Sequence, residues 1–304
     1  MSLPFLTQAQ APLTSEIDAV NESGELQKVS IPAERALTVY VDKRELVTLM
    51  TLGANPELLV LGYLRNQRLV RDVADIESIT VDWDVGAAAV KTVRGIEDIE
   101  EKTAHRVVTT GCGQGSVFGG LMDEVDQIAL PAGACITQGQ LYGLVNTIRL
   151  KETTYKSAGS VHACALFSMV SGESEMLLFV EDVGRHNAID TIAGWMWMNM
   201  APTLIDPALA ASDAAASPSG TAGLVFYTTG RLTSEMVIKS AQMGVPVVVS
   251  RSGITQMGHQ VAQSVGLCAI GRATNKRFLC YTHSGRLRLE PGLLAAHSAS
   301  AGAG

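Results

Sequence analysis

A glycine-rich stretch that carries one thiol is the part of the sequence best suited to covalent chemistry. It runs from Thr109 to Gly120, as TTGCGQGSVFGG, and places five glycines around Cys112. Glycine loses more backbone entropy on ordering than any other residue and brings no side chain to pack, so the stretch predicts a mobile loop. A cysteine there can meet a reagent, and its reactivity follows the fraction of thiolate. The loop by itself is equally compatible with an ordinary turn whose cysteine is merely exposed.

Three arginines form a second group, because each follows a predicted strand and precedes a predicted helix. They are Arg185, Arg231 and Arg251, and His186 and Ser234 lie close to them in sequence. In an open α/β sheet, ligands bind beyond the carboxyl ends of the strands, where the helix N-termini point their free N–H groups. One such arginine alone is usually a solvated residue. Three arginines that converge on one place predict a phosphate or pyrophosphate site, since arginine can bind such groups through two parallel hydrogen bonds.

Histidines and the remaining cysteines do not predict a metal site. His162 and Cys164 alternate on one strand, but zinc needs three or four protein ligands, and the deaminase pattern HxE followed by PCxxC is absent. The role of His186 stays open: it could act as an acid or base, or it could orient a neighbour or bind an anion. The five cysteines include no CxxC pair, which argues against a disulfide framework or a zinc ribbon and favours a reducing compartment. Three cysteines in apolar runs are predicted core residues: Cys135, Cys268 and Cys280.

Composition sets the class of protein. The chain has 304 residues, 47% of them hydrophobic, which is enough for one large domain or two ordinary ones around a sizeable core. Its net charge of −7 argues against a nucleic-acid surface, so an anionic ligand must be held locally. No stretch reaches the roughly 18 apolar residues that span a bilayer, and the start lacks the order of a signal peptide. We therefore expect a cytoplasmic protein.

The elements that position these residues follow two patterns. The first part of the chain predicts a hairpin of residues 36–41 and 45–50, a helix that opens at Asn55-Pro56, and paired strands at 76–85 and 87–93. From Glu181 onward, strand, polar turn and helix repeat, which predicts a mixed, largely parallel sheet with right-handed crossovers. Thr137 and Gln140 form a predicted capping box for a helix that ends near Lys151.

These patterns predict four segments of the chain. The expected segments are a poorly ordered lead-in at 1–30, an N-terminal α+β subdomain at 31–135 that ends in the Cys112 loop, an α/β core at 136–285 with a flexible insertion at 201–220, and a disordered tail at 286–304.

Four stretches of sequence resemble the formate dehydrogenase accessory sulfurtransferase family of the FdhD type. They are ERALTVYVDKRELVTLMTLGANPELLVLGYL from Glu34, EDVGRHNAID from Glu181, GRLTSEMVIKSAQMGVPVVVSRSGIT from Gly230 and RFLCYTH from Arg277. The resemblance therefore runs from about Glu34 to Thr282. It implies an α/β fold with a cytidine-deaminase-like core that has lost its zinc ligands, in a cytoplasmic homodimer.

The resemblance also implies a persulfide carrier. Such a protein accepts sulfur from a cysteine desulfurase and passes it to the bis(molybdopterin guanine dinucleotide) molybdenum cofactor before this enters the formate dehydrogenase apoprotein. The family loop carries Cys-Gly-x-Cys-Gly, whereas here Cys112 matches the first cysteine and Gly115 stands at the second. A relay between two loop cysteines is therefore excluded, and the sulfur is expected on Cys112 alone. One thiol suffices for a persulfide. The sequence leaves open whether a second thiol takes part.

The resemblance extends to a cofactor-binding segment, in which Arg272 is expected to contact phosphate and Ile270 replaces the usual aromatic residue. The matched segment is Ile270, Gly271, Arg272, Ala273, Thr274 and Asn275. Together with Arg185, His186, Arg231, Ser234 and Arg251 it forms the predicted cofactor site, with no catalytic metal. One alternative is a chaperone that binds the cofactor without transferring sulfur. The other is a zinc-dependent nucleoside deaminase, which the absent ligands argue against.

Overall fold

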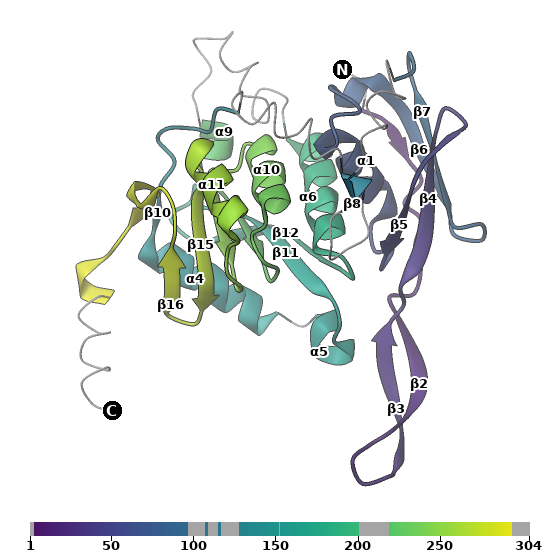
Figure 1. The fold of residues 1–304 in the computed structure, drawn as a ribbon, viewed down its shortest axis with the longest axis horizontal. Helices are drawn as coiled ribbons and strands as arrows, with labels where there is room; N and C mark the ends of the chain where they lie inside the picture. Colours follow the sequence, from purple (N-terminus) through teal and green to yellow (C-terminus); the bar gives the residue numbers. More distant parts are fainter. Residues whose placement is uncertain are drawn as a thin grey trace. The chain divides into compact units, whose positions relative to one another are not determined.

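The computed structural model describes residues 3–96, 107–108, 115–116, 128–151, 153–200 and 219–293 (Figure 1). The chain divides into two compact units. Unit 1 comprises Met1–Asp123, Glu152–Cys164 and Val180–Met200, and unit 2 comprises Glu124–Lys151, Ala165–Phe179 and Ala201–Gly304. This division differs from the predicted one, because two segments expected in the core at 136–285 belong to unit 1.

Unit 1 is built on a five-stranded sheet in the order β1-β6-β7-β4-β5. Its strands are β1 (Phe5–Leu6), β4 (Arg35–Val41), β5 (Arg44–Thr51), β6 (Ile76–Asp82) and β7 (Ala87–Thr92). The predicted hairpin is confirmed as β4 and β5, and the predicted partners at 76–85 and 87–93 are β6 and β7, which pair antiparallel. Alternate residues of β4 are buried, as are Leu46, Leu49 and Thr51 of β5, which fits a sheet with one face on a core.

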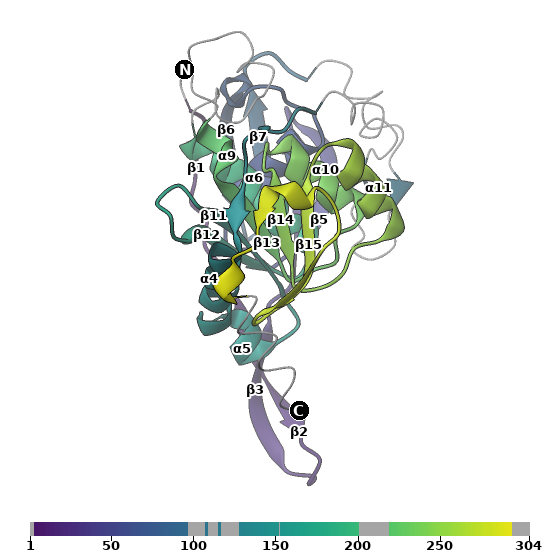
Figure 2. The ribbon, with the colours of Figure 1, turned by 90° about the vertical axis from the view of Figure 1, so that its left-hand side faces the viewer.

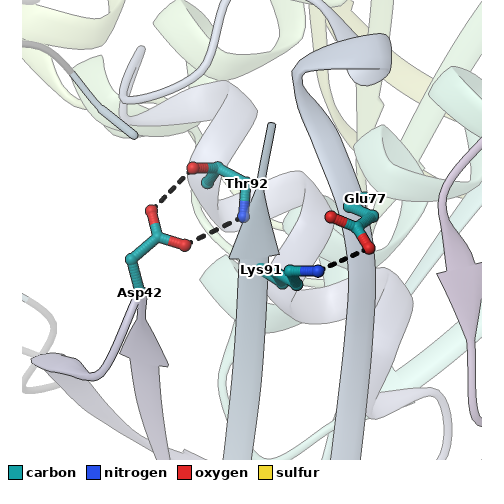
Figure 3. Close-up of polar contacts among 4 residues, drawn as sticks. All are labelled: Asp42, Glu77, Lys91 and Thr92. Carbon is teal, nitrogen blue, oxygen red and sulfur yellow. Dashed lines mark hydrogen bonds and ion pairs between the residues drawn. The ribbon is translucent and has the colours of Figure 1, made fainter. Parts of the chain in front are cut away.

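The turn between β4 and β5 is tied to a neighbouring strand. Asp42 and Lys43 have φ values of 48° and 75°, the left-handed conformation that a tight hairpin turn requires of its central residues. The Asp42 carboxylate accepts hydrogen bonds from the Thr92 N–H at 3.0 Å and the Thr92 hydroxyl at 2.6 Å (Figure 3). On the same sheet, Lys91 and Glu77 form an exposed ion pair of 2.7 Å between β7 and β6 (Figure 3).

The first 30 residues contain strands, contrary to the poorly ordered lead-in that the sequence predicted. β1 joins the main sheet through a parallel pairing with β6. β2 (Thr14–Val20) and β3 (Leu26–Pro32) form a separate antiparallel hairpin. The polar composition hid this hairpin, because its strands lack the alternation of a half-buried sheet.

Helix α1 (Pro56–Asn66) packs closely on α6 (Arg185–Asn199) within unit 1. α1 begins at Pro56 as predicted, although the Asn55 side chain makes no capping hydrogen bond. A Cβ on Gly62 would lie 1.6 Å from the Asp190 carbonyl oxygen, and one on Gly194 would lie 2.0 Å from the Leu58 carbonyl oxygen. The two backbones touch at these glycines, so no larger residue fits at the crossing. Short helices η1 (Val73–Asp75) and α5 (Thr154–Ala158) complete the unit.

A six-stranded sheet in the order β12-β11-β13-β14-β15-β16 carries unit 2. The strands are β11 (His162–Ser168), β12 (Glu175–Asp182), β13 (Leu224–Thr228), β14 (Val247–Ser250), β15 (Cys268–Thr274) and β16 (Arg277–Cys280). β13, β14 and β15 pair in parallel, and β16 is antiparallel to β15. The mixed, largely parallel α/β sheet expected from the sequence is therefore confirmed. The boundary between the units passes through β11 and β12.

Helices cover both faces of this sheet. Figure 2 shows α4 (Gln138–Leu150) on one side of β13–β15, and α10 (Ser234–Gln242) and α11 (Gln256–Ser264) on the other. The predicted capping box opens α4, because Thr137 Oγ1 accepts from the Gln140 N–H and the Gln140 side chain accepts from the Thr137 N–H. Alternate strand residues join Leu141 and Leu144 of α4 in one core cluster, and each fully buried aliphatic side chain contributes about 1.5–3 kcal/mol.

Several short elements complete the described chain. β8 (Val107–Val108) and β9 (Gly115–Ser116) pair antiparallel, β10 (Ile136–Thr137) pairs in parallel with β17 (Leu287–Arg288), and α9 (Ser219–Ala222) and η3 (Ser284–Arg286) are single turns. β17 lies in the tail that was expected to be disordered. Most of the predicted insertion at 201–220 lies outside the described residues. None of the described helices combines the length and apolar character needed to cross a membrane.

Candidate functional site

The predicted nucleophile, Cys112, lies outside the described residues, but the backbone on both sides of its segment is described. Val107 pairs with Ser116 and Val108 pairs with Gly115. This antiparallel pairing brings together the two ends of the segment that carries Cys112. Gly115, which the resemblance matched to a second cysteine, belongs to strand β9.

Most of the predicted cofactor residues gather at the carboxyl ends of β13, β14 and β15 in unit 2. We call residues 229–234, 251–255 and 271–275 the arginine edge. Ser250 links the first two loops, because its hydroxyl donates to the Gly230 carbonyl oxygen at 2.7 Å and accepts from the Ser252 N–H at 2.9 Å. The Arg251 N–H donates to the Thr228 carbonyl oxygen at 3.0 Å. Buried hydrogen bonds of this kind hold the two loops in one arrangement.

The third segment of the arginine edge, residues 271–275, lies largely within a strand rather than in a loop. Residues 270–274, which belong to the cofactor-binding segment expected from the resemblance, form the end of β15, where the pairing with β16 is irregular between Gly271 and Thr274. Arg272 has a φ of 51° and donates its N–H to the Ser252 carbonyl oxygen at 2.7 Å. A Cβ on Gly271 would lie 2.7 Å from Tyr281 Cε2 and 2.8 Å from the Ser252 carbonyl oxygen, so only glycine fits. Bulges of this type re-aim side chains and occur beside active sites.

The arginine edge presents three exposed arginine side chains. Arg231 and Arg251 follow β13 and β14, and Arg272 lies near the end of the adjacent strand β15. Within the described part of the chain none of their side chains forms an ion pair or hydrogen bond. Their charges are therefore available to an anion, and arginine suits phosphate in particular. Thr274 and Asn275 are exposed beside them, whereas Ile270 and Ala273 are buried in the core and offer a ligand no side-chain surface.

The two helices that begin at the arginine edge differ in their caps. Thr255 caps α11 by accepting a hydrogen bond from the Gly258 N–H at 3.1 Å. Thr233 stands at the same position of α10 but makes no capping bond, and among the described residues its buried hydroxyl finds no partner. The first N–H groups of α10, next to Ser234, therefore lack a side-chain cap, which suits an anion. Further along α10, Lys239 pairs with the buried carboxylate of Glu235 at 3.5 Å.

Arg185 and His186 belong to unit 1 and are not exposed. They occupy the first turn of α6 and are 5% and 2% exposed. The structure thus brings Arg231, Arg251 and the 271–275 strand end together within one unit, and it places Arg185 in the other. A common site for all three predicted arginine turns stays a prediction.

Asp182, which sequence reasoning missed, organises the start of α6. Its buried carboxylate accepts hydrogen bonds from the Thr51 hydroxyl at 2.5 Å, the Leu52 N–H at 3.1 Å, the Gly184 N–H at 3.1 Å and the Asn187 side chain at 2.7 Å. Burial raises the pKa of Asp182 and outweighs these four donors, which act to lower it. The sequence signal was an acidic residue directly after an apolar strand and before a glycine turn.

The cysteines predicted to be core residues have three different environments. Cys268 is buried, as predicted. Cys135 is exposed and Cys280 is half-buried, so these two predictions are wrong. Cys135 precedes a two-residue strand and Cys280 ends the strand at the edge of the sheet, where apolar neighbours in sequence do not ensure burial. In the described ranges, no cluster of three histidine, cysteine or acidic side chains could hold a metal ion.

Known proteins are similar to this chain in sequence and in fold. The model of the FdhD/NarQ family matches residues 32–288. A sulfur carrier protein of Bacillus subtilis is 30% identical, over 88% of this chain and 94% of its own length. One of Wolinella succinogenes is 26% identical, over 87% and 84%. A crystal structure from Desulfotalea psychrophila, assigned as a formate dehydrogenase accessory protein, matches 91% of this chain and 100% of its own with a TM-score of 0.67. At 20% identity, that likeness establishes the common fold.

Proposed function

Because the chain belongs to the FdhD/NarQ family, we propose that it is a sulfur carrier required for formate dehydrogenase activity. The observation that carries this proposal is the extent of the family match, which runs from residue 32 to residue 288 and so includes Cys112 and the arginine edge. The relatives named as sulfur carrier proteins align over most of their own length, which supports carrying the same role to this chain.

Cys112 is the proposed carrier atom. Its thiolate attacks the outer sulfur of a persulfide on a cysteine desulfurase. A new sulfur–sulfur bond forms on Cys112, the bond in the donor breaks, and the donor cysteine leaves as a thiolate. The product is a Cys112 persulfide whose terminal sulfur is available for transfer. Gly115 provides no thiol in the same loop, so the persulfide cannot be converted to a disulfide there.

The proposed recipient is the bis(molybdopterin guanine dinucleotide) molybdenum cofactor, which the protein binds as a substrate. The exposed guanidinium groups of Arg231, Arg251 and Arg272 and the uncapped start of α10 favour its phosphate groups. In this proposal Ser234 and the exposed residues Thr274 and Asn275 line the same site in unit 2. The proposed partners are a cysteine desulfurase, the formate dehydrogenase apoprotein and a second copy of this chain.

Complementation tests the carrier role in cells. A strain that lacks its own carrier would receive wild-type protein, Cys112→Ser or the control Cys135→Ser, and formate dehydrogenase activity would be assayed at matched protein levels. We expect Cys112→Ser to lose activation, because an alcohol cannot hold a persulfide. Cys135→Ser removes an exposed cysteine outside the glycine-rich stretch and should retain activation.

A cofactor-binding chaperone is the second candidate function. The observation that favours it is the glycine at position 115, which leaves the loop with half the usual thiols. It predicts that Cys112→Ser restores full formate dehydrogenase activity, because shielding the cofactor needs no thiol. That result would reject sulfur transfer at Cys112 and leave the binding role.

A further inference from the structure

Two thiols that have no part in the proposed carrier role lie against each other in unit 2. Cys268 is in β15 and Cys280 is in β16, and their Sγ atoms are 3.8 Å apart. Ile270 pairs directly with Cys280, so Cys268 is the diagonal neighbour of Cys280 on the same face of the hairpin. The pair is therefore set by the register of two adjacent strands.

The two thiols have unequal environments. Cys268 is fully buried, whereas Cys280 is half-buried on the strand at the edge of the sheet. A hydrogen bond from the Cys268 thiol lowers the pKa of Cys280, although burial opposes this shift. The same hydrogen bond and then burial raise the pKa of Cys268. In its thiol form Cys280 lies 3.5 Å from the Thr282 carbonyl oxygen, to which it donates.

The charged and titratable groups around the pair shift mainly the pKa of Cys268. The Arg286 guanidinium favours its thiolate, and a negative charge on Cys135 disfavours it. Arg286 is held in place because it donates to the Gly266 carbonyl oxygen at 3.0 Å and to the Pro131 carbonyl oxygen at 2.5 Å. A reachable thiol of lowered pKa next to a buried thiol is the arrangement of a nucleophile and a resolving cysteine.

We propose that Cys268 and Cys280 form a dithiol site that reduces the sulfur–sulfur bond of a small persulfide or disulfide. Cys280 attacks one sulfur of the substrate, the substrate bond breaks, and a thiolate leaves. Cys268 then loses its proton and attacks Cys280 Sγ. This step forms a Cys268–Cys280 disulfide and releases hydrogen sulfide from a persulfide, or a second thiol from a disulfide. The substrate gains the two electrons that the dithiol loses, so no other oxidant is needed.

Closing the disulfide requires a small movement. The sulfur atoms must approach from 3.8 Å to about 2.05 Å, the length of a disulfide bond. Cys280 is the last residue of β16, which has a neighbouring strand on one side in the sheet, so it is the partner with more freedom to move. The disulfide would also fasten the hairpin that carries Arg272.

Mapping the disulfide tests this site independently of the carrier role. Full-length Cys112→Ser protein, fully reduced, would be treated with either glutathione disulfide or glutathione persulfide. Free thiols are then alkylated and the protein is cut with trypsin. Cleavage after Arg251, Arg272, Arg277 and Arg286 separates the thiols into peptides 252–272 and 278–286. We expect these peptides to be linked by a disulfide, and the reagent that links them identifies the substrate.

A fixed order of attack is the second expectation. In Cys268→Ala protein the first adduct should accumulate on Cys280. In Cys280→Ala protein Cys268 should react at least about tenfold more slowly, because it is fully buried and burial still raises its pKa after the hydrogen bond to Cys280 is lost. The proposal is overturned if neither reagent links the two peptides while the exposed Cys135 is modified, or if Cys268 reacts as fast as Cys280.

Discussion

Cys280 offers the clearest test at the scale of single residues, because one neighbour, Cys268, contributes most to lowering its pKa. The hydrogen bond from Cys268 lowers the pKa of Cys280 below the ordinary cysteine value of 9.0. A thiol of lowered pKa becomes reactive at lower pH, since the thiolate is the nucleophile. We therefore predict that alkylation of Cys280 by iodoacetamide reaches half its maximal rate below pH 9.0.

The control removes the donor. In Cys268→Ala protein the half-maximal pH of Cys280 should rise, because burial then acts without the opposing hydrogen bond. The exposed Cys135 in the same samples reports any general change in the protein. An unchanged profile for Cys280 after Cys268→Ala would show that the hydrogen bond does not set its reactivity.

Contacts between residues close in sequence could be predicted from the sequence, whereas contacts between residues far apart in sequence could not. The capping box of Thr137 and Gln140 was predicted and confirmed, because both bonds form within three residues. Asp182 and the Cys268–Cys280 pair were missed. The donors to Asp182 include Thr51 and Leu52, which lie 131 and 130 residues away. Such contacts depend on how strands and helices assemble, and periodicity carries no information about them.

At the scale of elements, the close crossing of α1 and α6 predicts that Gly62 cannot be replaced by a larger residue without a loss of stability. Gly62→Ala places a methyl group 1.6 Å from the Asp190 carbonyl oxygen, which belongs to the backbone of α6 and cannot rotate away. We predict that this change lowers the free energy of unfolding by about 1–3 kcal/mol or more, measured by chemical denaturation.

A glycine in another helix provides the matched control for Gly62. A Cβ on Gly143 of α4 would meet only the side chain of Ser174, which can rotate. Gly143→Ala should be neutral or stabilising by about 0.5–1 kcal/mol, because alanine favours helix over glycine. Equal losses for the two variants would contradict the close helix crossing.

The arginine edge predicts selective binding of a nucleotide diphosphate. Guanosine diphosphate serves as the probe, because it contains the phosphate and base of the proposed cofactor. We expect Arg231→Ala, Arg251→Ala and Arg272→Ala each to weaken its affinity by about 10- to 150-fold, measured by calorimetry, since each removes a charge-assisted contact of about 1.5–3 kcal/mol.

An arginine elsewhere in unit 2 shows whether the effect is local. Arg288 is exposed on β17, whose neighbour is β10. Arg288→Ala removes the same charge and should leave the affinity within about twofold, because Arg288 is not part of the arginine edge and salt screens the interaction between exposed charges that are not in contact. Equal weakening by Arg288→Ala would mean that the nucleotide responds to net charge rather than to the arginine edge.

Most elements could be predicted because their patterns are local. The hairpin of β4 and β5, the strands β6 and β7 and the repeated strand–turn–helix units were found where alternation and turn residues indicated them. β2 and β3 were missed because their exposed strands lack a buried face. The end of β15 was expected to be a cofactor-binding segment from the family resemblance alone, and that resemblance gave no sign of its pairing with β16.

At the scale of the whole molecule, the sequence predicted a two-part organisation but not how the chain is divided. The expected boundary near residue 135 assumed that each part is continuous in sequence. Instead, unit 1 also takes Glu152–Cys164 and Val180–Met200, because α6 packs on α1, more than 100 residues earlier in the chain. Long-range packing of this kind leaves no signal in composition. The predicted homodimer stays a prediction.

Loading the purified protein with sulfur tests the central claim most directly. Wild-type, Cys135→Ser and Cys112→Ser proteins would be incubated with a cysteine desulfurase and cysteine, and their intact masses would be measured before and after reduction. The account predicts a gain of one sulfur atom in the first two proteins, lost on reduction, and no gain in Cys112→Ser. The Cys268–Cys280 reaction ends in a disulfide and adds no sulfur, so it does not mimic this result. As much bound sulfur on Cys112→Ser as on wild type would contradict the carrier role of Cys112.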